Sequence, residues 1–152
     1  MLNCTYELNN EDISLLKCGA TSFEAFSGNE GHRNKKTSAC LSGAGPIPTG
    51  KYYMIDRRSG GLLGPIRDLF NDKDEWIALY AIDKKIDDSV MCNNIKRGQF
   101  RIHPKGPMAI SNGCIVITTQ KDFNFFKSIL GNTKKEKIPG SNVETYGVLT
   151  VK

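Results

Sequence analysis

The segment FRIHPKGPMAISNGCIVIT, residues 100–118, contains the two clearest strand patterns in the chain. FRIH and CIVIT are short and rich in β-branched or aromatic residues, which favour strands. About ten residues lie between them, including two prolines and two glycines, a composition typical of an irregular turn. We therefore expect a strand, a turn and a returning strand, in a fold where β-structure dominates.

Similar patterns recur along the chain, separated by turn residues. Strands are predicted at residues 4–8, 13–18, 21–28, 51–56, 98–103, 114–118 and 145–151. Residues 75–83 are compatible with a strand or a short helix, and the β-rich context favours a strand. The first two strands flank the polar turn NNED and are expected to form a hairpin. Residues 28–45 are rich in Gly, Ser, Asn and Lys and are predicted to form a long loop, of the kind that often serves as a lid or a binding surface.

One helix is predicted, over residues 119–132 (TQKDFNFFKSILGN). Thr119 is a suitable N-cap and Gly131 stands where a C′ glycine is expected. The apolar residues fall on one face: Phe123, Phe126, Ile129 and Leu130. With no linker or repeat visible, the chain is expected to be a single domain, 1–152, of mostly β (β-rich α+β) class with one well-defined helix.

Composition limits the classes of function without choosing among them. The chain has 152 residues and a formal net charge of +5, which favours anionic surroundings such as cell wall. The basic clusters 32–36 and 134–137 are short and separate. Because the sequence shows no basic stripe interleaved with aromatic residues, nucleic-acid binding is not expected. The sequence has no run of about 20 apolar residues, the length that a membrane-spanning helix requires, so membrane insertion is not expected. The first residues lack the pattern of a signal peptide.

The cysteines are informative because their number is odd. Of five, at least one must stand outside any disulfide within the chain. They form no C-x-x-C pair or zinc spacing, and the two histidines lie far apart, so we expect no metal site and no cofactor. The disulfide state of Cys4, Cys18, Cys40 and Cys92 stays open.

The spacing of His103 and Cys114 indicates a candidate thiol site. Alternation along FRIH puts Arg101 and His103 on one face, and a returning strand brings Cys114 to the same end of the sheet. An imidazole beside a thiol generates the thiolate nucleophile at neutral pH. Gly113 allows close backbone approach, and the N–H groups of residues 113 and 114 are candidates for an oxyanion hole.

Two points about this candidate site stay open. A hydrogen bond from Ser111, or one to a backbone carbonyl, can orient His103. The same residues are also compatible with a buried structural thiol beside a surface histidine, since cysteine outside disulfides is among the most buried residue types.

These motifs carry a family resemblance. SNGCI (111–115), preceded by FRIH, resembles the signature of the L,D-transpeptidase (YkuD-type) catalytic domain: a histidine, a spacer, then Ser/Thr-x-Gly-Cys. GPIPTGKYYM (45–54) is similar to the stretch that leads into a strand before that site. With AFSGN (25–29), the order of blocks is most similar to the Tlde-type effectors of type VI secretion. The resemblance spans roughly residues 4–118.

The sequence also departs from the housekeeping L,D-transpeptidases. The spacer between histidine and cysteine is shorter, Asn112 stands where histidine is frequent, and Val116 replaces a polar residue. Arg101, on the face of His103, is our candidate to replace that polarity. We therefore assign Arg101 and Asn112 to substrate binding.

The resemblance implies a YkuD-like β-sandwich or barrel-type fold and a cysteine enzyme of peptidoglycan. It implies Cys114 as nucleophile and His103 as base, with Ser111 and Gly113 in the catalytic motif, acting on stem tetrapeptides as an L,D-carboxypeptidase or L,D-transpeptidase. It further implies synthesis in the cytoplasm, type VI secretion, action in the periplasm of a target bacterium and a cognate immunity protein. The alternatives are a housekeeping cross-linking L,D-transpeptidase and a non-catalytic wall-binding module.

Overall fold

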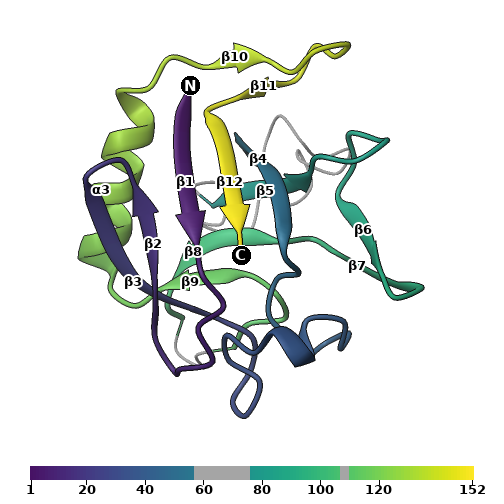
Figure 1. Cartoon of the computed structure of the whole chain (residues 1–152). Coiled ribbons are helices and arrows are strands. Elements are labelled where there is room, and N and C mark those ends of the chain that lie inside the picture. The colour runs from purple at the N-terminus through teal and green to yellow at the C-terminus, as the bar shows by residue number, and fades with distance from the viewer. Residues whose placement is uncertain (57–75, 107–109) are drawn as a thin grey trace.

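A closed barrel of eight strands forms the body of the molecule (Figure 1). The computed structural model describes residues 1–56, 76–106 and 110–152. Within these, the barrel order is β1-β12-β4-β5-β8-β9-β3-β2. The strands are β1 (Leu2–Tyr6), β2 (Ser14–Cys18), β3 (Thr21–Ser27), β4 (Gly50–Asp56), β5 (Ile77–Ala81), β8 (Arg101–Pro104), β9 (Ile115–Ile117) and β12 (Gly147–Val151). The predicted mostly β fold of barrel type is confirmed.

The ends of the described chain meet in the barrel wall. β1 pairs antiparallel with β2, which confirms the predicted hairpin, and parallel with the last strand, β12. The first and last strands therefore lie side by side, and this pairing closes the barrel (Figure 1).

The pairing of β8 with β9 differs from the prediction. The two strands are neighbours but run parallel, with Ile102 opposite Ile115 and His103 opposite Val116. A simple return would have made them antiparallel. The connection instead leads from the end of β8 back to the start of β9, and its residues 107–109 lie outside the described part of the chain.

Alternation along β8 and β9 separates the core from the site. Phe100, Ile102, Ile115 and Ile117 belong to the main hydrophobic core. Arg101 and His103 alternate with them and face the other way, as the sequence predicted. The interior of the barrel thus positions the backbone, while the opposite face of these two strands carries the candidate chemistry.

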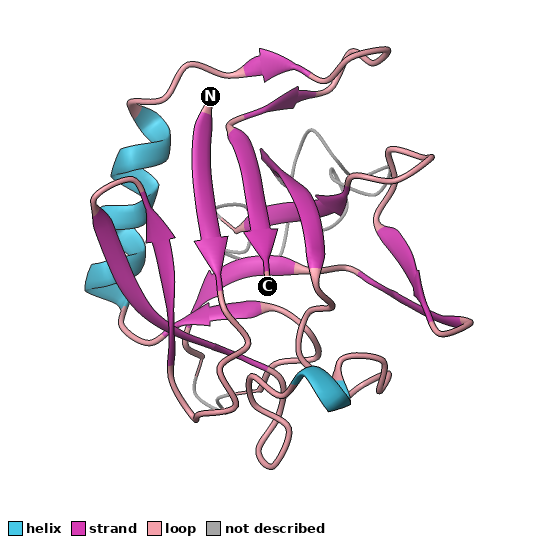
Figure 2. Ribbon diagram, in the orientation of Figure 1, coloured by secondary structure: helices cyan, strands magenta, loops and turns pink. Residues whose placement is uncertain are grey.

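The single α-helix, α3 (Gln120–Gly131), follows β9 and packs against β8 and β9 (Figure 2). The predicted N-cap is confirmed, because the Thr119 side chain accepts a hydrogen bond from the Asp122 backbone N–H. Phe123, Phe126 and Leu130 are buried in the main core. The predicted C-terminus was wrong by one position: Gly131 is the last helical residue, and Asn132 is the C-cap that bonds back to the final turn.

Two short hairpins and one 3-10 turn were not predicted from the sequence. The hairpins are β6 (Ser89–Cys92) with β7 (Ile95–Gly98), and β10 (Glu136–Lys137) with β11 (Glu144–Thr145); the turn is η1 (Lys36–Ser38) within the 28–45 loop. Asn93 and Asn94, both with positive φ, form the tight β6–β7 turn. Two-residue hairpin turns of type I′ require positive φ at both central residues, a conformation that asparagine adopts more often than most residues with a side chain.

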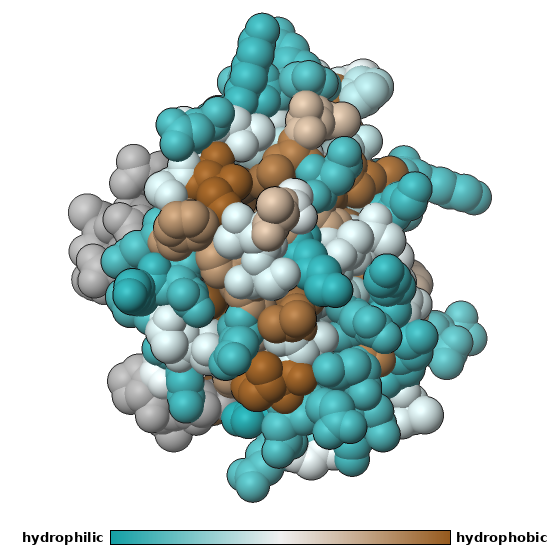
Figure 3. Space-filling model, turned by 60° about the vertical axis from the view of Figure 1, so that its left-hand side comes forward, coloured by the Kyte–Doolittle hydropathy of each residue, from teal (hydrophilic) through white to brown (hydrophobic). Residues whose placement is uncertain are grey.

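The surface drawn in Figure 3 is mixed in character, with hydrophobic residues in small groups among hydrophilic and neutral ones. In the described residues, no helix has the length and apolarity needed to cross a membrane.

Candidate functional site

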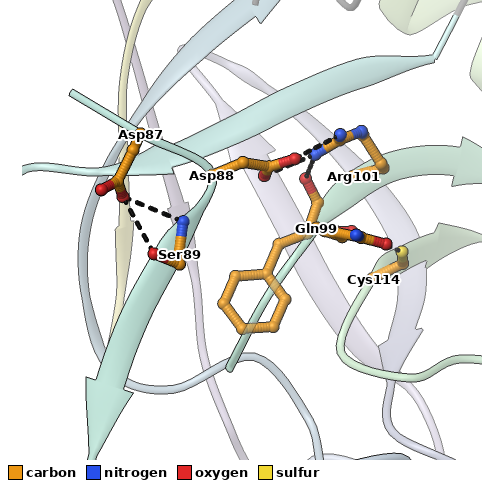
Figure 4. A network of polar contacts seen from close by, with 7 residues as sticks. Asp87, Asp88, Ser89, Gln99, Arg101 and Cys114 are labelled. Atoms are coloured by element: carbon orange, nitrogen blue, oxygen red, sulfur yellow. Dashed lines mark hydrogen bonds and ion pairs between the residues drawn. The ribbon is translucent and has the colours of Figure 1, made fainter. Parts of the chain in front are cut away.

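Cys114 lies immediately before β9 and is the cysteine outside the two disulfides. Cys4 pairs with Cys18 across the β1–β2 hairpin, and Cys40 in the 28–45 loop pairs with Cys92 of β6. The predicted odd thiol is therefore Cys114. It is half-buried, and its S–H group donates to the Gln99 carbonyl at 3.8 Å (Figure 4).

His103 is held by an aromatic stack and a backbone contact. The residue is 7% exposed. Its ring stacks on Trp76, with the ring centroids 4.2 Å apart and the planes 19° from parallel. Nδ1 lies 2.8 Å from the Pro104 carbonyl oxygen. Because a carbonyl only accepts hydrogen bonds, Nδ1 carries the proton in this contact, and in the neutral ring Nε2 is the basic nitrogen. This is the tautomer that a general base requires.

The strand register brings the two predicted catalytic residues onto one face of neighbouring strands. Ile102 lies opposite Ile115, so Cys114 lies beside Arg101, and His103 is two residues farther along the same face. The prediction that both residues lie at the same end of the sheet was wrong, because the parallel pairing puts Cys114 beside the start of β8 and His103 close to its end. The pairing of the sulfur with the imidazole stays a prediction.

Ser111 organises the turn that leads into Cys114. Its hydroxyl donates to the Cys114 carbonyl at 2.6 Å and accepts from the Gly28 N–H at 3.0 Å. Its backbone N–H donates to the Asn29 side chain at 2.9 Å. Because its one hydroxyl hydrogen is used on Cys114, Ser111 does not donate to His103. Of the two expected ways to orient His103, the backbone carbonyl is the one that this geometry provides.

The peptide carbonyls on both sides of the Gly113 Cα are held by side chains from other parts of the fold. The Asn112 carbonyl accepts from the Arg97 side chain at 3.1 Å, and the Gly113 carbonyl accepts from the Ser27 hydroxyl at 3.3 Å. In a trans peptide the N–H points opposite to the carbonyl. The Gly113 N–H is therefore directed away from Arg97, and the Cys114 N–H away from Ser27; their joint action as an oxyanion hole stays a prediction.

The two residues assigned to substrate binding both form side-chain hydrogen bonds with other residues of the protein. Arg101 forms a bidentate ion pair with Asp88, at 2.9 and 2.6 Å (Figure 4). Burial opposes its charge, but the hydrogen bonds and charge of Asp88 raise the pKa of Arg101 above its usual value. Asn112 is exposed, and its side-chain oxygen accepts from Asn29 at 2.9 Å. Their assignment to substrate stays a prediction.

Arg97, on β7, is a site residue that sequence reasoning missed. It is 4% exposed, and its guanidinium donates to the backbone carbonyls of the 28–45 loop region and of the turn before Cys114. The acceptors are the carbonyls of Ala39, Gly45, Pro46 and Asn112. In KRGQF it is one basic residue among many, so only its burial distinguishes it. Trp76 was likewise missed by sequence reasoning as the stacking partner of His103.

A cleft of about 550 Å³ lies along the β6–β7 hairpin and the residue that follows it, Gln99. It is lined by Asp87, Asp88, Ser89 and residues 96–99. Gln99, at one end of this lining, is the residue whose carbonyl accepts from Cys114. Gln99 also has a φ of 58°, in the left-handed region that is costly for a residue with a side chain. Such conformations cluster at functional sites.

Comparison with known proteins identifies the family of the chain. The Tlde1 domain family matches residues 21–141, a range that includes β3, the 28–45 loop, the β6–β7 hairpin, His103 and Cys114. No curated protein and no solved structure matches the chain. Since the family match covers most of the sequence and agrees with the resemblance carried by FRIH and SNGCI, the chain belongs to the Tlde1 domain family.

Proposed function

We propose that this protein is a cysteine L,D-carboxypeptidase and exchange transpeptidase that acts on peptidoglycan stem tetrapeptides as a type VI secretion effector. The observation that carries the proposal is the sharing of one β8–β9 face by His103 and Cys114, within a Tlde1 family match. Acyl transfer requires a nucleophile, a base and donors for the oxyanion. In this proposal they are the half-buried sulfur of Cys114, Nε2 of His103 and the N–H groups of Gly113 and Cys114.

The proposed reaction begins with proton transfer from the Cys114 thiol to Nε2 of His103. The thiolate attacks the amide carbonyl between diaminopimelate and the terminal D-alanine, and the Gly113 and Cys114 N–H groups stabilise the oxyanion. When the C–N bond breaks, His103 returns the proton to the amine of D-alanine, which leaves. A thioester to Cys114 remains.

The acceptor decides the product. Water, deprotonated by His103, hydrolyses the thioester and leaves a shortened stem. A D-amino acid gives exchange, and a second stem peptide gives a cross-link. Trimming and exchange both remove the tetrapeptide donors that cross-linking enzymes use. The expected consequence is a peptidoglycan with fewer cross-links.

Membership of the Tlde1 family supports the effector role. An enzyme of this kind reaches its substrate in the periplasm of a target cell, and the producing cell requires protection there. We therefore expect a cognate immunity protein that covers the site around Cys114.

The test compares wild-type protein with Cys114→Ala on purified tetrapeptide muropeptides, followed by mass spectrometry. We expect wild type to release D-alanine and Cys114→Ala to release none while keeping its circular dichroism spectrum. Full release by Cys114→Ala would contradict the proposal. New cross-links without trimming would favour the housekeeping transpeptidase.

A parallel measurement separates the enzyme from a wall-binding module. Cys114 in an active site should react rapidly with iodoacetamide at neutral pH, because the thiolate is the reacting form. Slow labelling, together with retained binding to wall fragments, would identify a structural thiol.

A further inference from the structure

Arg97 joins three parts of the protein that are distant in the sequence. It comes from β7, and it donates to the carbonyls of Gly45 at 3.1 Å and Pro46 at 2.8 Å, to that of Ala39, and to that of Asn112 at 3.1 Å. A buried guanidinium with several carbonyl acceptors restricts the backbone at each of them. Arg97 therefore connects the 28–45 loop region to the turn that carries the nucleophile.

The contact with Asn112 acts directly on the proposed oxyanion hole. Arg97 holds the carbonyl of the peptide whose other end is the Gly113 N–H. The packing is tight: a Cβ on Gly113 would lie 2.7 Å from Nη2 of Arg97. If Arg97 were removed, this peptide could rotate, and the Gly113 N–H would lose its fixed direction.

Arg97 and its neighbour Arg101 differ in the groups that surround their positive charges. Both guanidiniums interact electrostatically with Cys114. The charge of Arg101 is balanced by the bidentate pair with Asp88. The hydrogen-bond acceptors of Arg97 among the described residues are neutral carbonyls. Burial lowers the pKa of Arg97, against the opposing effects of Tyr52 and Cys114, yet an arginine remains protonated at neutral pH.

We propose that Arg97 is the positioning residue of the cysteine site. It orients the Gly113 N–H toward the substrate, and its positive charge, which has no carboxylate partner among the described residues, stabilises the Cys114 thiolate. The inference rests on the proposed function for its catalytic meaning. Its electrostatic part concerns the thiol alone and is measurable without substrate.

The experiment measures the rate of Cys114 alkylation by iodoacetamide against pH in wild type, Arg97→Lys and Arg97→Met. We expect Arg97→Met to move the alkylation midpoint upward by about one pH unit, with a fall of about tenfold in rate at pH 7. Arg97→Lys keeps the charge without the planar fork and should restore most of the midpoint. The matched control is Arg33→Met, which removes an arginine of the 28–45 loop that stacks over Phe26 and should leave the profile unchanged.

The second readout separates positioning from charge. On tetrapeptide substrate, Arg97→Lys should lower kcat at least tenfold with little change in KM, because the oxyanion contact matters mainly in the transition state. An unchanged midpoint in folded Arg97→Met would overturn the proposal. Loss of folding in both variants would also overturn it, by making Arg97 a residue of the fold rather than of the site. If wild type releases no D-alanine while the midpoint still moves, the proposed function fails and the electrostatic role stands.

Discussion

Gly113 shows how one residue can meet several demands of the site at once. Its φ of 107° lies in a region that favours glycine, and the position of a Cβ would be 2.5 Å from Cε1 of the Phe100 ring. Phe100 is 2% exposed in the main core, so its ring cannot easily move aside. Glycine at this position thus allows the turn before Cys114 to pack directly on Phe100 and Arg97.

At the residue scale, Gly113→Ala should destabilise the protein by roughly 2–4 kcal/mol, through backbone strain and overpacking together. Urea denaturation measures the change. Gly131→Ala is the control, because no atom lies within 4 Å of its Cβ position and alanine favours a helix. We expect Gly131→Ala to be neutral or slightly stabilising. Equal stability of Gly113→Ala and wild type would mean that the turn is not constrained in this way.

At the scale of elements, Asp56 connects the end of β4 to the C-terminal part of the chain. Lys135, between α3 and β10, donates to Oδ2 at 2.8 Å, and the Tyr146 hydroxyl, between β11 and β12, donates to Oδ1 at 2.6 Å. Burial opposes the charge of Asp56, but these hydrogen bonds and Lys135 hold its pKa below the usual 3.8. The carboxylate therefore stabilises the attachment of the β10–β11 hairpin to the barrel.

This contact predicts a dependence of stability on acid. Because the pKa of Asp56 is lower in the folded state than in the unfolded state, its contribution is complete above the unfolded value and is lost as pH falls through the folded value. The contribution is about 0.5–1 kcal/mol, since the pair is partly exposed. In urea denaturation at pH 7 and pH 3, the loss of stability should be smaller for Asp56→Asn than for wild type. Asp12→Asn, in the exposed β1–β2 turn, should behave like wild type.

At the scale of the whole molecule, the two disulfides restrict different regions. Cys4–Cys18 joins neighbouring strands of one hairpin, 14 residues apart, whereas Cys40–Cys92 joins the 28–45 loop to β6 across 52 residues. Cys40 directly follows Ala39, whose carbonyl accepts from Arg97 of β7. The second disulfide and Arg97 therefore attach the same loop to the same hairpin.

Removal of the two disulfides should have different consequences. Chain-entropy arguments give costs of roughly 3 kcal/mol for Cys4–Cys18 and roughly 4 kcal/mol for Cys40–Cys92. Only the double variant Cys40→Ser/Cys92→Ser should also slow Cys114 alkylation at pH 7, because it loosens the partners of Arg97. Cys4→Ser/Cys18→Ser is the matched control. A similar alkylation rate in both variants would show that the loop attachment does not reach the site.

Short-range patterns predicted much of this architecture. Composition, alternation and turn residues identified the barrel strands, with β5 assigned from its β-rich context, and alternation gave the two faces of FRIH. The helical period with Thr119 located α3. These features depend on neighbours within a few residues, so they can be read locally. The hairpins were missed because they are short, and the helix end was misjudged because Asn132 rather than glycine caps it.

The sequence by itself determined the mostly β class, the helix, the odd cysteine and the family resemblance carried by the motif of His103 and Cys114. Only the tertiary structure decided that β8 and β9 run parallel, that Trp76 stacks on His103 and that Arg97 holds the turn before Cys114. The physical reason is the range of the interactions. Propensity and periodicity act between near neighbours, whereas strand direction, ring stacking and buried hydrogen bonds join segments that only the closed barrel brings together.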